Sequence, residues 1–124
     1  MNKKKILVVE DELTSQQLIQ FHLNNTGEYE VKILADGKQT LAAANAYSPD
    51  LILLDIIIPD TSGVDISREL ESEANLKDIP VVFITSLVTE DEVASQDGIF
   101  YNRPCLAKPI TKDKLLDCVR KNIR

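Results

Sequence analysis

Short runs of consecutive apolar residues are the most regular feature of this chain. Three of them, at residues 6–9, 51–54 and 81–84, contain no polar position and are rich in β-branched residues. Uninterrupted runs of this length are typical of strands buried on both faces, as in a parallel sheet. Residues 31–35 alternate instead, which predicts a strand nearer an edge of the sheet. A fifth, short run at residues 105–107 follows a proline, which the start of a strand tolerates.

Apolar residues recur at helical spacing between these runs. The pattern predicts helices over residues 13–25, 38–47, 64–74 and 112–123. Helix start signals support a helix after each of three N-cap residues, Ser62, Thr89 and Thr111. Strand and helix therefore alternate along the chain. This order predicts a single α/β domain over residues 1–124, a doubly wound parallel sheet with helices on both faces.

The net charge and the cysteine content indicate which kinds of partner the protein can bind and in which cellular compartment it is expected. The net charge is −6, whereas electrostatic binding of nucleic acid needs a basic surface. The basic run at residues 3–5 we interpret as a solvated chain start. The apolar run after it stops at Glu10, too early for a signal peptide, and no run is long enough to span a membrane. Cys105 and Cys118 match no metal-binding spacing, so we expect reduced thiols and a cytoplasmic protein.

Polar residues suited to chemistry stand directly after four of the predicted strands. Glu10 and Asp11 follow the first apolar run, Asp55 and Thr85 follow the next two buried runs, and Lys108 follows the last. In a doubly wound fold, ligands bind outside the carboxyl ends of the strands. We therefore expect three carboxylates, a hydroxyl and an ammonium group to meet at one edge of the sheet.

This set of groups suits phosphoryl transfer to a carboxylate. Clustered carboxylates repel one another unless a cation lies among them, and their oxygen atoms suit Mg²⁺. A carboxylate can serve as a nucleophile, and the phosphoryl oxygens then need charge neutralisation. Lys108 can supply a point charge and Thr85 a hydrogen-bond donor. Taken singly, each residue has an ordinary structural explanation, such as Asp11 capping a helix. Their joint placement at strand ends indicates function.

Four motifs resemble those of the receiver domains of two-component response regulators. They are Ile-Leu-Val-Val-Glu-Asp-Glu at residues 6–12, Pro-Asp-Leu-Ile-Leu-Leu-Asp at 49–55, Pro-Asp-Thr-Ser-Gly at 59–63 and Lys-Pro at 108–109. The resemblance runs from about Lys4 to the C-terminus. It implies a flavodoxin-like fold whose five parallel strands lie in the order 2-1-3-4-5, and a cis peptide bond between Lys108 and Pro109.

The resemblance also implies a role for each candidate residue. Asp55 would accept a phosphoryl group from a sensor histidine kinase or a histidine phosphotransfer protein. Thr85 and Lys108 would contact that group, and Thr85 would move inward on activation. The implied ligands of Mg²⁺ are Glu10, Asp11, Asp55 and the backbone carbonyl of Ile57.

Such a protein is a signalling receiver and not an enzyme that acts on other molecules. It would catalyse only its own aspartyl phosphorylation and dephosphorylation. Because nothing follows the last helix of this sequence, we expect it to signal through phosphorylation-dependent contacts with a downstream protein target. We expect no direct contact with nucleic acid or membrane.

Three features depart from the receiver pattern. The aromatic residue expected three positions before the lysine is Cys105, whose thiol is small and behaves largely as a buried hydrophobe. Residues 98–104 lack the usual Gly-Ala-Asp turn and predict an irregular loop, with Phe100 and Tyr101 anchored against the sheet. The spacing from Thr85 to Lys108 is about one residue longer than usual. These departures concern the output surface and leave the phosphorylation site intact.

Three other functions compete with that of a receiver domain. A phosphatase of the haloacid-dehalogenase type expects an aspartate two positions after the nucleophile, where this chain has Ile57. A flavin-binding flavodoxin expects a hydroxyl- and glycine-rich phosphate loop, where this chain has acidic residues 10–12. The remaining alternative is a receiver-fold interaction module that works without phosphorylation. His22, on the first helix, we interpret as a partly exposed helix residue and not as a phosphorelay histidine.

Overall fold

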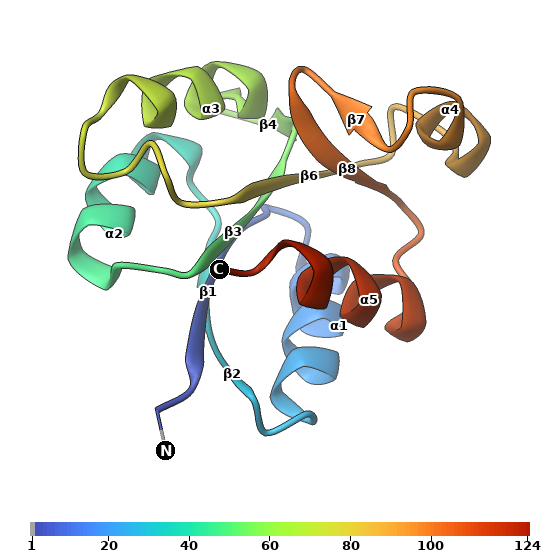
Figure 1. Ribbon diagram of the computed structural model, residues 1–124, viewed down its shortest axis with the longest axis horizontal. Coiled ribbons are helices and arrows are strands. Elements are labelled where there is room, and N and C mark those ends of the chain that lie inside the picture. The colour runs from blue at the N-terminus through green and yellow to red at the C-terminus, as the bar shows by residue number, and fades with distance from the viewer. Residues whose placement is uncertain (1) are drawn as a thin grey trace.

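A computed structural model describes residues 2–124 and places one mixed sheet at the centre of the molecule (Figure 1). The sheet has six strands in the order β2-β1-β3-β6-β8-β7. Its first five are parallel, which confirms the predicted order, and β7 is added antiparallel to β8. The strands are β2 (Tyr29–Leu34), β1 (Lys4–Val9), β3 (Leu51–Asp55), β6 (Val81–Thr85), β8 (Arg103–Ala107) and β7 (Ile99–Phe100).

Helices cover both faces of the sheet, as the alternating pattern predicted. One face carries α1 (Leu13–Asn24) and α5 (Lys112–Asn122). The other carries α2 (Thr40–Tyr47) and α3 (Gly63–Ser72), and the short α4 (Glu90–Ser95) lies beside β8. A 3-10 turn, η1 (Gly37–Gln39), precedes α2, so the predicted helix at residues 38–47 begins differently than expected. No helix within residues 2–124 is long and apolar enough to cross a membrane.

The buried strands explain why three apolar runs showed no alternation. Along β1, Ile6 and Val8 pack into the core under α1 and α5, while Leu7 and Val9 pack into the core under α2 and α3. Both faces of the strand are therefore buried, and for this reason apolar residues occupy successive positions without alternation. By contrast β2 pairs only with β1 and lies at an edge, which accounts for its alternating sequence.

Hydroxyl side chains begin the helices where the sequence indicated. Thr89 and Glu92 form a reciprocal capping box at α4. Ser62 accepts a hydrogen bond from the amide of Val64 at the start of α3, and Thr111 caps α5. At α1 the N-cap residue is Glu12, with no side-chain capping bond, so Asp11 does not cap this helix.

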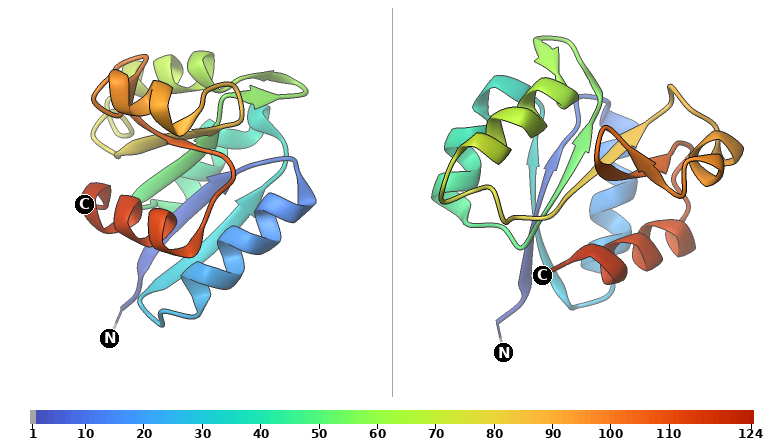
Figure 2. Two further views of the ribbon diagram at one scale, coloured as in Figure 1. Left: turned by 90° about the vertical axis from the view of Figure 1, so that its right-hand side faces the viewer. Right: turned by 45° about the horizontal axis from the view of Figure 1, so that its top comes forward.

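Residues 98–104 form a β-hairpin, so the prediction of an irregular loop is wrong. Ile99 pairs with Pro104 and Phe100 with Arg103, and the turn between them is made by Tyr101 and Asn102. Both turn residues have positive φ angles, 49° and 65°, a conformation suited to the twist of a tight hairpin. Figure 2 shows the hairpin beside α4, at the edge of the sheet opposite β2.

The hairpin is fixed to the body of the protein at two places. The ring of Tyr101 packs edge-on against buried Phe83 at a centroid distance of 6.3 Å. This contact agrees with the expectation that the aromatic residues of this segment are anchored against the sheet. The guanidinium of Arg103 donates to Ser67 at 3.1 Å and pairs with Glu71 at 3.3 Å, both on α3. One aromatic contact therefore joins the hairpin to β6, and two polar contacts join it to α3.

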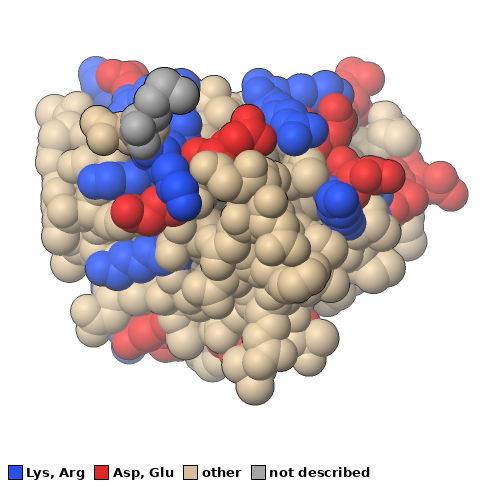
Figure 3. Space-filling model, turned by 90° about the horizontal axis from the view of Figure 1, so that it is seen from below, with Lys and Arg blue, Asp and Glu red and all other residues tan. Residues whose placement is uncertain are grey.

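Charged side chains are unevenly distributed over the surface. Residues 13–27, which include all of α1, contain no Asp, Glu, Lys or Arg. Figure 3, seen from below, shows a broad uncharged area next to groups in which basic and acidic side chains are mixed. On this face the basic side chains do not form one continuous surface.

Candidate functional site

The carboxyl ends of β1, β3, β6 and β8 bring the candidate residues to one edge of the sheet. Asp55 is the last residue of β3, and Thr85 is the last residue of the neighbouring β6. Glu10 and Lys108 directly follow β1 and β8. The backbone amide of Lys108 donates to the carbonyl of Thr85 at 2.8 Å, which fixes where the chain turns away from the sheet. The peptide bond between Lys108 and Pro109 is cis, as predicted.

The ammonium group of Lys108 lies among three carboxylates. Its Nζ donates to Oε1 of Glu10 at 3.0 Å and to Oδ2 of Asp55 at 3.0 Å. Oε1 of Glu12 lies 3.7 Å away on the solvent side. The Lys108 side chain is only 16% exposed. The site is therefore organised around one largely buried cation.

Burial and charge shift the pKa values of these groups. Burial, with Asp55 close by, raises the pKa of Glu10 to about 7, although Lys108 opposes the shift. Burial alone would lower the pKa of Lys108, but its hydrogen bonds to Glu10 and Asp55 outweigh this and raise the pKa above its ordinary value. The site thus holds more negative charge than its single ammonium group can neutralise.

The carboxylate cluster fits a divalent cation. Glu10, Asp11 and Asp55 each offer an oxygen, and these oxygens lie within 4.8 Å of one another. Oε2 of Glu10 is buried and has no hydrogen-bond partner among residues 2–124. An unpaired buried carboxylate oxygen is costly, and a hard cation would satisfy it. Of the predicted ligands, the structure brings these three side chains together.

Thr85 and Ile57 lie beside the cluster, each held by a local hydrogen bond. Oγ1 of buried Thr85 accepts a hydrogen bond from the amide of Leu87 at 3.0 Å. Its hydroxyl is therefore engaged with the following loop in this structure. The amide of Ile57 donates to Oδ1 of Asp55 at 3.0 Å. The role of the Ile57 carbonyl stays a prediction.

A small hairpin, made of β4 (Ile57–Ile58) and β5 (Thr61–Ser62), follows Asp55 at the end of β3. The amide of Gly63 donates to the carbonyl of Ile56 at 2.9 Å. A Cβ atom at Gly63 would lie 2.2 Å from the backbone oxygen of Asp55. Only glycine allows α3 to begin this close to the strand end. The sequence showed the Ser-Gly motif but not this contact.

Asp60 ties the same small hairpin to α2. Its carboxylate accepts hydrogen bonds from the amides of Gly37 at 3.2 Å and Lys38 at 2.9 Å, which begin the 3-10 turn η1. A side-chain hydrogen bond with Asp36 and these backbone amides lower the pKa of Asp60. Asp60 of the Pro-Asp motif thus has a structural role, which the sequence alone did not reveal.

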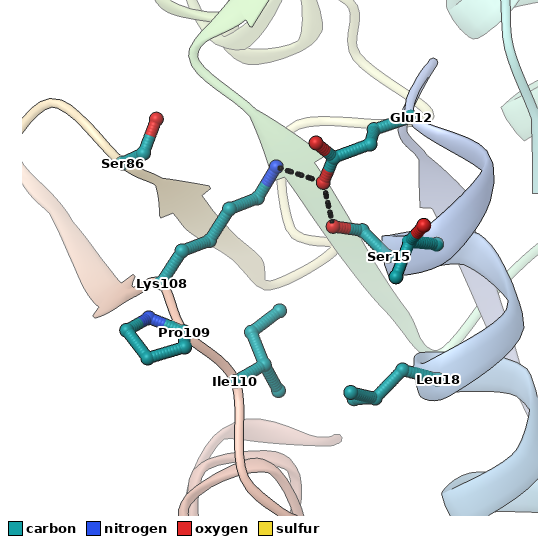
Figure 4. Close-up of a pocket in the computed structure, with 8 residues that line it drawn as sticks. Glu12, Ser15, Leu18, Ser86, Lys108, Pro109 and Ile110 are labelled. Carbon is teal, nitrogen blue, oxygen red and sulfur yellow. Dashed lines mark hydrogen bonds and ion pairs between the residues drawn. The ribbon is translucent and has the colours of Figure 1, made fainter.

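A cleft opens beside Lys108, between α1 and the segment 108–110 that precedes α5. Its volume is about 410 Å³. Figure 4 shows Leu18 and Ile110 along the cleft, with Glu12 and Lys108 facing each other at one end. Glu12 and Ser15 were not among the predicted site residues. The only sequence signal was the third acidic residue of the Glu-Asp-Glu run.

Cys105 lies in the core and away from the carboxylates. It packs against the cluster of apolar side chains on the α2 and α3 face of the sheet. Burial raises the pKa of its thiol to about 11, which suppresses the reactive thiolate. Cys105 and Cys118 form no disulfide in the described part of the chain. This agrees with the interpretation of Cys105 as a small buried hydrophobe.

Comparison with known proteins identifies the family of this arrangement. A family profile described as "Response regulator receiver domain" matches residues 6–120. A probable transcriptional regulator, ycf27, of Cyanophora paradoxa is 38% identical over the whole of this chain and half of its own length. The polar-differentiation response regulator DivK of Brucella ovis is 28% identical, with 94% of each chain covered. The chain spans about half the length of the first curated relatives it matches.

A solved structure gives the same architecture. The receiver domain of the sensor histidine kinase PA1611 from Pseudomonas aeruginosa superposes with a TM-score of 0.79 at 30% identity, with 97% of each chain covered. In that structure a magnesium ion is coordinated in the active site cleft. The fold is thus that of a characterised group of proteins.

Proposed function

This chain belongs to the response regulator receiver domain family, and on that premise we propose that Asp55 is its phosphoacceptor, with Mg²⁺ bound beside it. The observation that carries the proposal is the position of Lys108 between Glu10 and Asp55, together with the unpaired buried oxygen of Glu10. The phosphoryl donor is a histidine kinase or a histidine phosphotransfer protein. Labelling with a small phosphodonor in the presence of Mg²⁺ tests the proposal.

Each residue of the site has a separate role in the phosphoryl transfer. A carboxylate oxygen of Asp55 forms a bond to phosphorus as the bond from phosphorus to the donor nitrogen breaks, and the donor imidazole leaves with the electron pair. Lys108 neutralises charge on the transferred group. The hydroxyl of Thr85, whose oxygen accepts a hydrogen bond from the amide of Leu87 in this structure, donates a hydrogen bond to a phosphoryl oxygen. Mg²⁺ held by Glu10, Asp11, Asp55 and the Ile57 carbonyl would supply further charge neutralisation.

Such a receiver modifies only itself and passes the signal on by contact. It catalyses its own phosphorylation and dephosphorylation and acts on no other substrate. Its downstream target is a protein that distinguishes the two states of Asp55. The free thiols of Cys105 and Cys118 fit the expected cytoplasmic location.

Metal binding should depend on pH through Glu10. Because the pKa of Glu10 is raised from 4.5 to about 7 in the folded protein, the native state holds this proton more tightly than the unfolded chain. Its contribution should therefore lower the stability of the metal-free protein as pH rises from 4.5 to about 7. Mg²⁺ needs the ionised carboxylate, so its stabilising effect should grow over the same window.

Thermal unfolding with and without Mg²⁺ across this pH range measures both effects. Glu10→Gln is the matched control, since it keeps the shape of the side chain but cannot titrate. It should remove the Glu10 contribution to the pH dependence, and Asp11→Asn should weaken the Mg²⁺ effect. A Mg²⁺ shift of the same size at every pH, or one unchanged in Glu10→Gln, would contradict the assignment of these ligands.

The phosphorylated state should be long-lived. Ile57 and Leu87, two residues after Asp55 and Thr85, are 53% and 58% exposed and flank the site. Neither side chain can orient a water molecule by hydrogen bonding. Substituting Ile57→Asn and Leu87→Glu together should accelerate hydrolysis about tenfold or more. Decay of labelled protein after removal of the donor measures this, and equal or slower decay in the double variant would refute it.

The response to phosphorylation should concentrate in residues 86–104. Tyr101 contacts Phe83, two residues before Thr85 on the same strand, and Arg103 joins the hairpin to α3. Movement at Thr85 can therefore reach the hairpin without an aromatic residue at position 105. Hydrogen exchange with and without beryllium fluoride and Mg²⁺ should show the change there. A change confined to α1 and α2, or a response lost in Cys105→Ala, would count against this route.

A further inference from the structure

The end of the cleft next to Asp55 carries a carboxylate that metal binding and phosphoryl transfer do not use. Glu12 is 61% exposed, and its Oε1 lies 3.7 Å from Nζ of Lys108. The same Nζ lies 3.0 Å from Oδ2 of Asp55. The carboxylates of Glu12 and Asp55 therefore share one ammonium group, and Glu12 is the exposed member of the pair.

Glu12 is held in this position from two directions. Oγ of Ser15 donates to Oε1 of Glu12 at 2.5 Å, and the amide of Glu12 donates to Oε1 of Glu10 at 3.2 Å. Figure 4 shows the Glu12 carboxylate directed toward Lys108 and Ser15 at the end of the cleft. Ser15 and Lys108 thus hold the Glu12 carboxylate at the mouth of the site, while the bond to Glu10 holds its backbone.

We propose that Glu12 is a specificity-determining residue, which disfavours small anionic phosphodonors at the mouth of the site. The inference rests on the proposed phosphorylation of Asp55. A free acyl phosphate is small and interacts with the protein mainly through its negative charges. A negative charge at the entrance of the site therefore lowers its local concentration there. A protein donor also binds through a docking surface. The repulsion from one carboxylate is too small to cancel the affinity that this surface provides. Glu12 thereby favours macromolecular donors over metabolites.

The reaction that reports on Glu12 is labelling by acetyl phosphate. A carboxylate oxygen of Asp55 bonds to phosphorus, the bond from phosphorus to the acetyl oxygen breaks, and acetate leaves with the electron pair. Acetyl phosphate is a dianion at neutral pH, whereas phosphoramidate carries about one negative charge less. A fixed carboxylate must therefore slow the first donor more than the second.

The test compares labelling rates of the full chain in Mg²⁺ for wild type, Glu12→Gln and Glu69→Gln. Glu69 is an exposed residue of α3, so its substitution changes net charge equally without touching the cleft. Glu12→Gln should raise the acetyl phosphate rate roughly threefold to tenfold at low salt, with a smaller rise for phosphoramidate. Added salt should reduce the difference, and Glu69→Gln should match wild type. Ser15→Ala should give a smaller increase than Glu12→Gln.

Every other outcome of this experiment contradicts the role proposed for Glu12 or the proposed function. Equal acetyl phosphate rates for wild type and Glu12→Gln would overturn the inference and leave the proposed function standing. An equal rise in Glu69→Gln would assign the effect to net charge and also overturn it, as would an equal rise for both donors. Absence of labelling in wild type would overturn the proposed function and this inference with it.

Discussion

Asp55→Asn should abolish phosphoryl labelling while leaving the protein folded. Asparagine has nearly the same shape, and its side-chain oxygen can still accept the hydrogen bond from the amide of Ile57. It lacks the anionic oxygen that attacks phosphorus, so the reaction has no nucleophile. The substitution also removes one of the three carboxylates of the candidate metal site, so Mg²⁺ should bind more weakly.

Labelling with acetyl phosphate and Mg²⁺, followed by intact-mass measurement, checks this expectation. Asp78→Asn is the matched control, because Asp78 is exposed and precedes β6, whereas the cluster lies at the carboxyl ends of the strands. It should label at the wild-type rate. Circular dichroism and thermal unfolding should show that both variants are folded. Labelling of Asp55→Asn at the wild-type level would exclude Asp55 as the acceptor.

Gly63→Ala should damage both stability and labelling. The new methyl group would lie 2.2 Å from the backbone oxygen of Asp55 and 2.8 Å from Cα of Ile56. Both neighbours are backbone atoms, so no side chain can rotate away to make room. The start of α3 must separate from the end of β3, at a cost of about 3 kcal/mol of unfolding free energy or more. The displacement also moves the phosphoacceptor.

The control for this change is Gly27→Ala. Gly27 has a positive φ of 72° but open space around its Cβ direction. The same chemical change should there cost only about 1–2 kcal/mol, through backbone strain, and leave labelling intact. Chemical denaturation of the two variants measures the difference. Wild-type stability and labelling in Gly63→Ala would show that the contact at Asp55 does not constrain the site.

The sequence predicted the parts of the fold that follow from burial and periodicity. Strands buried on both faces must be apolar at every position, so their apolar runs are visible in a single sequence. The alternating sequence of β2 was recognisable because one of its faces is less covered. The site was predictable for a related reason. Residues that follow parallel strands must meet at one edge of the sheet, whatever their separation along the chain.

The sequence did not predict features that depend on a single local conformation. The turn of the β7–β8 hairpin uses Tyr101 and Asn102 with positive φ angles, whereas tight hairpins usually place glycine there. The necessity of Gly63 depends on an atomic distance to Asp55 across the turn. The position of Glu12 depends on the rotamer of a long exposed side chain held by Ser15. None of these leaves a periodic signal.

The most direct test of the central claim is to locate the phosphoryl group in the wild-type protein. The chain is treated with acetyl phosphate and Mg²⁺, the acyl phosphate is reduced with borohydride, and the peptides are sequenced by mass spectrometry. We predict one modified residue, Asp55, and no modification when Mg²⁺ is removed by a chelator. Modification at His22 or at another carboxylate, or labelling of Asp55 that does not need a divalent cation, would contradict the account.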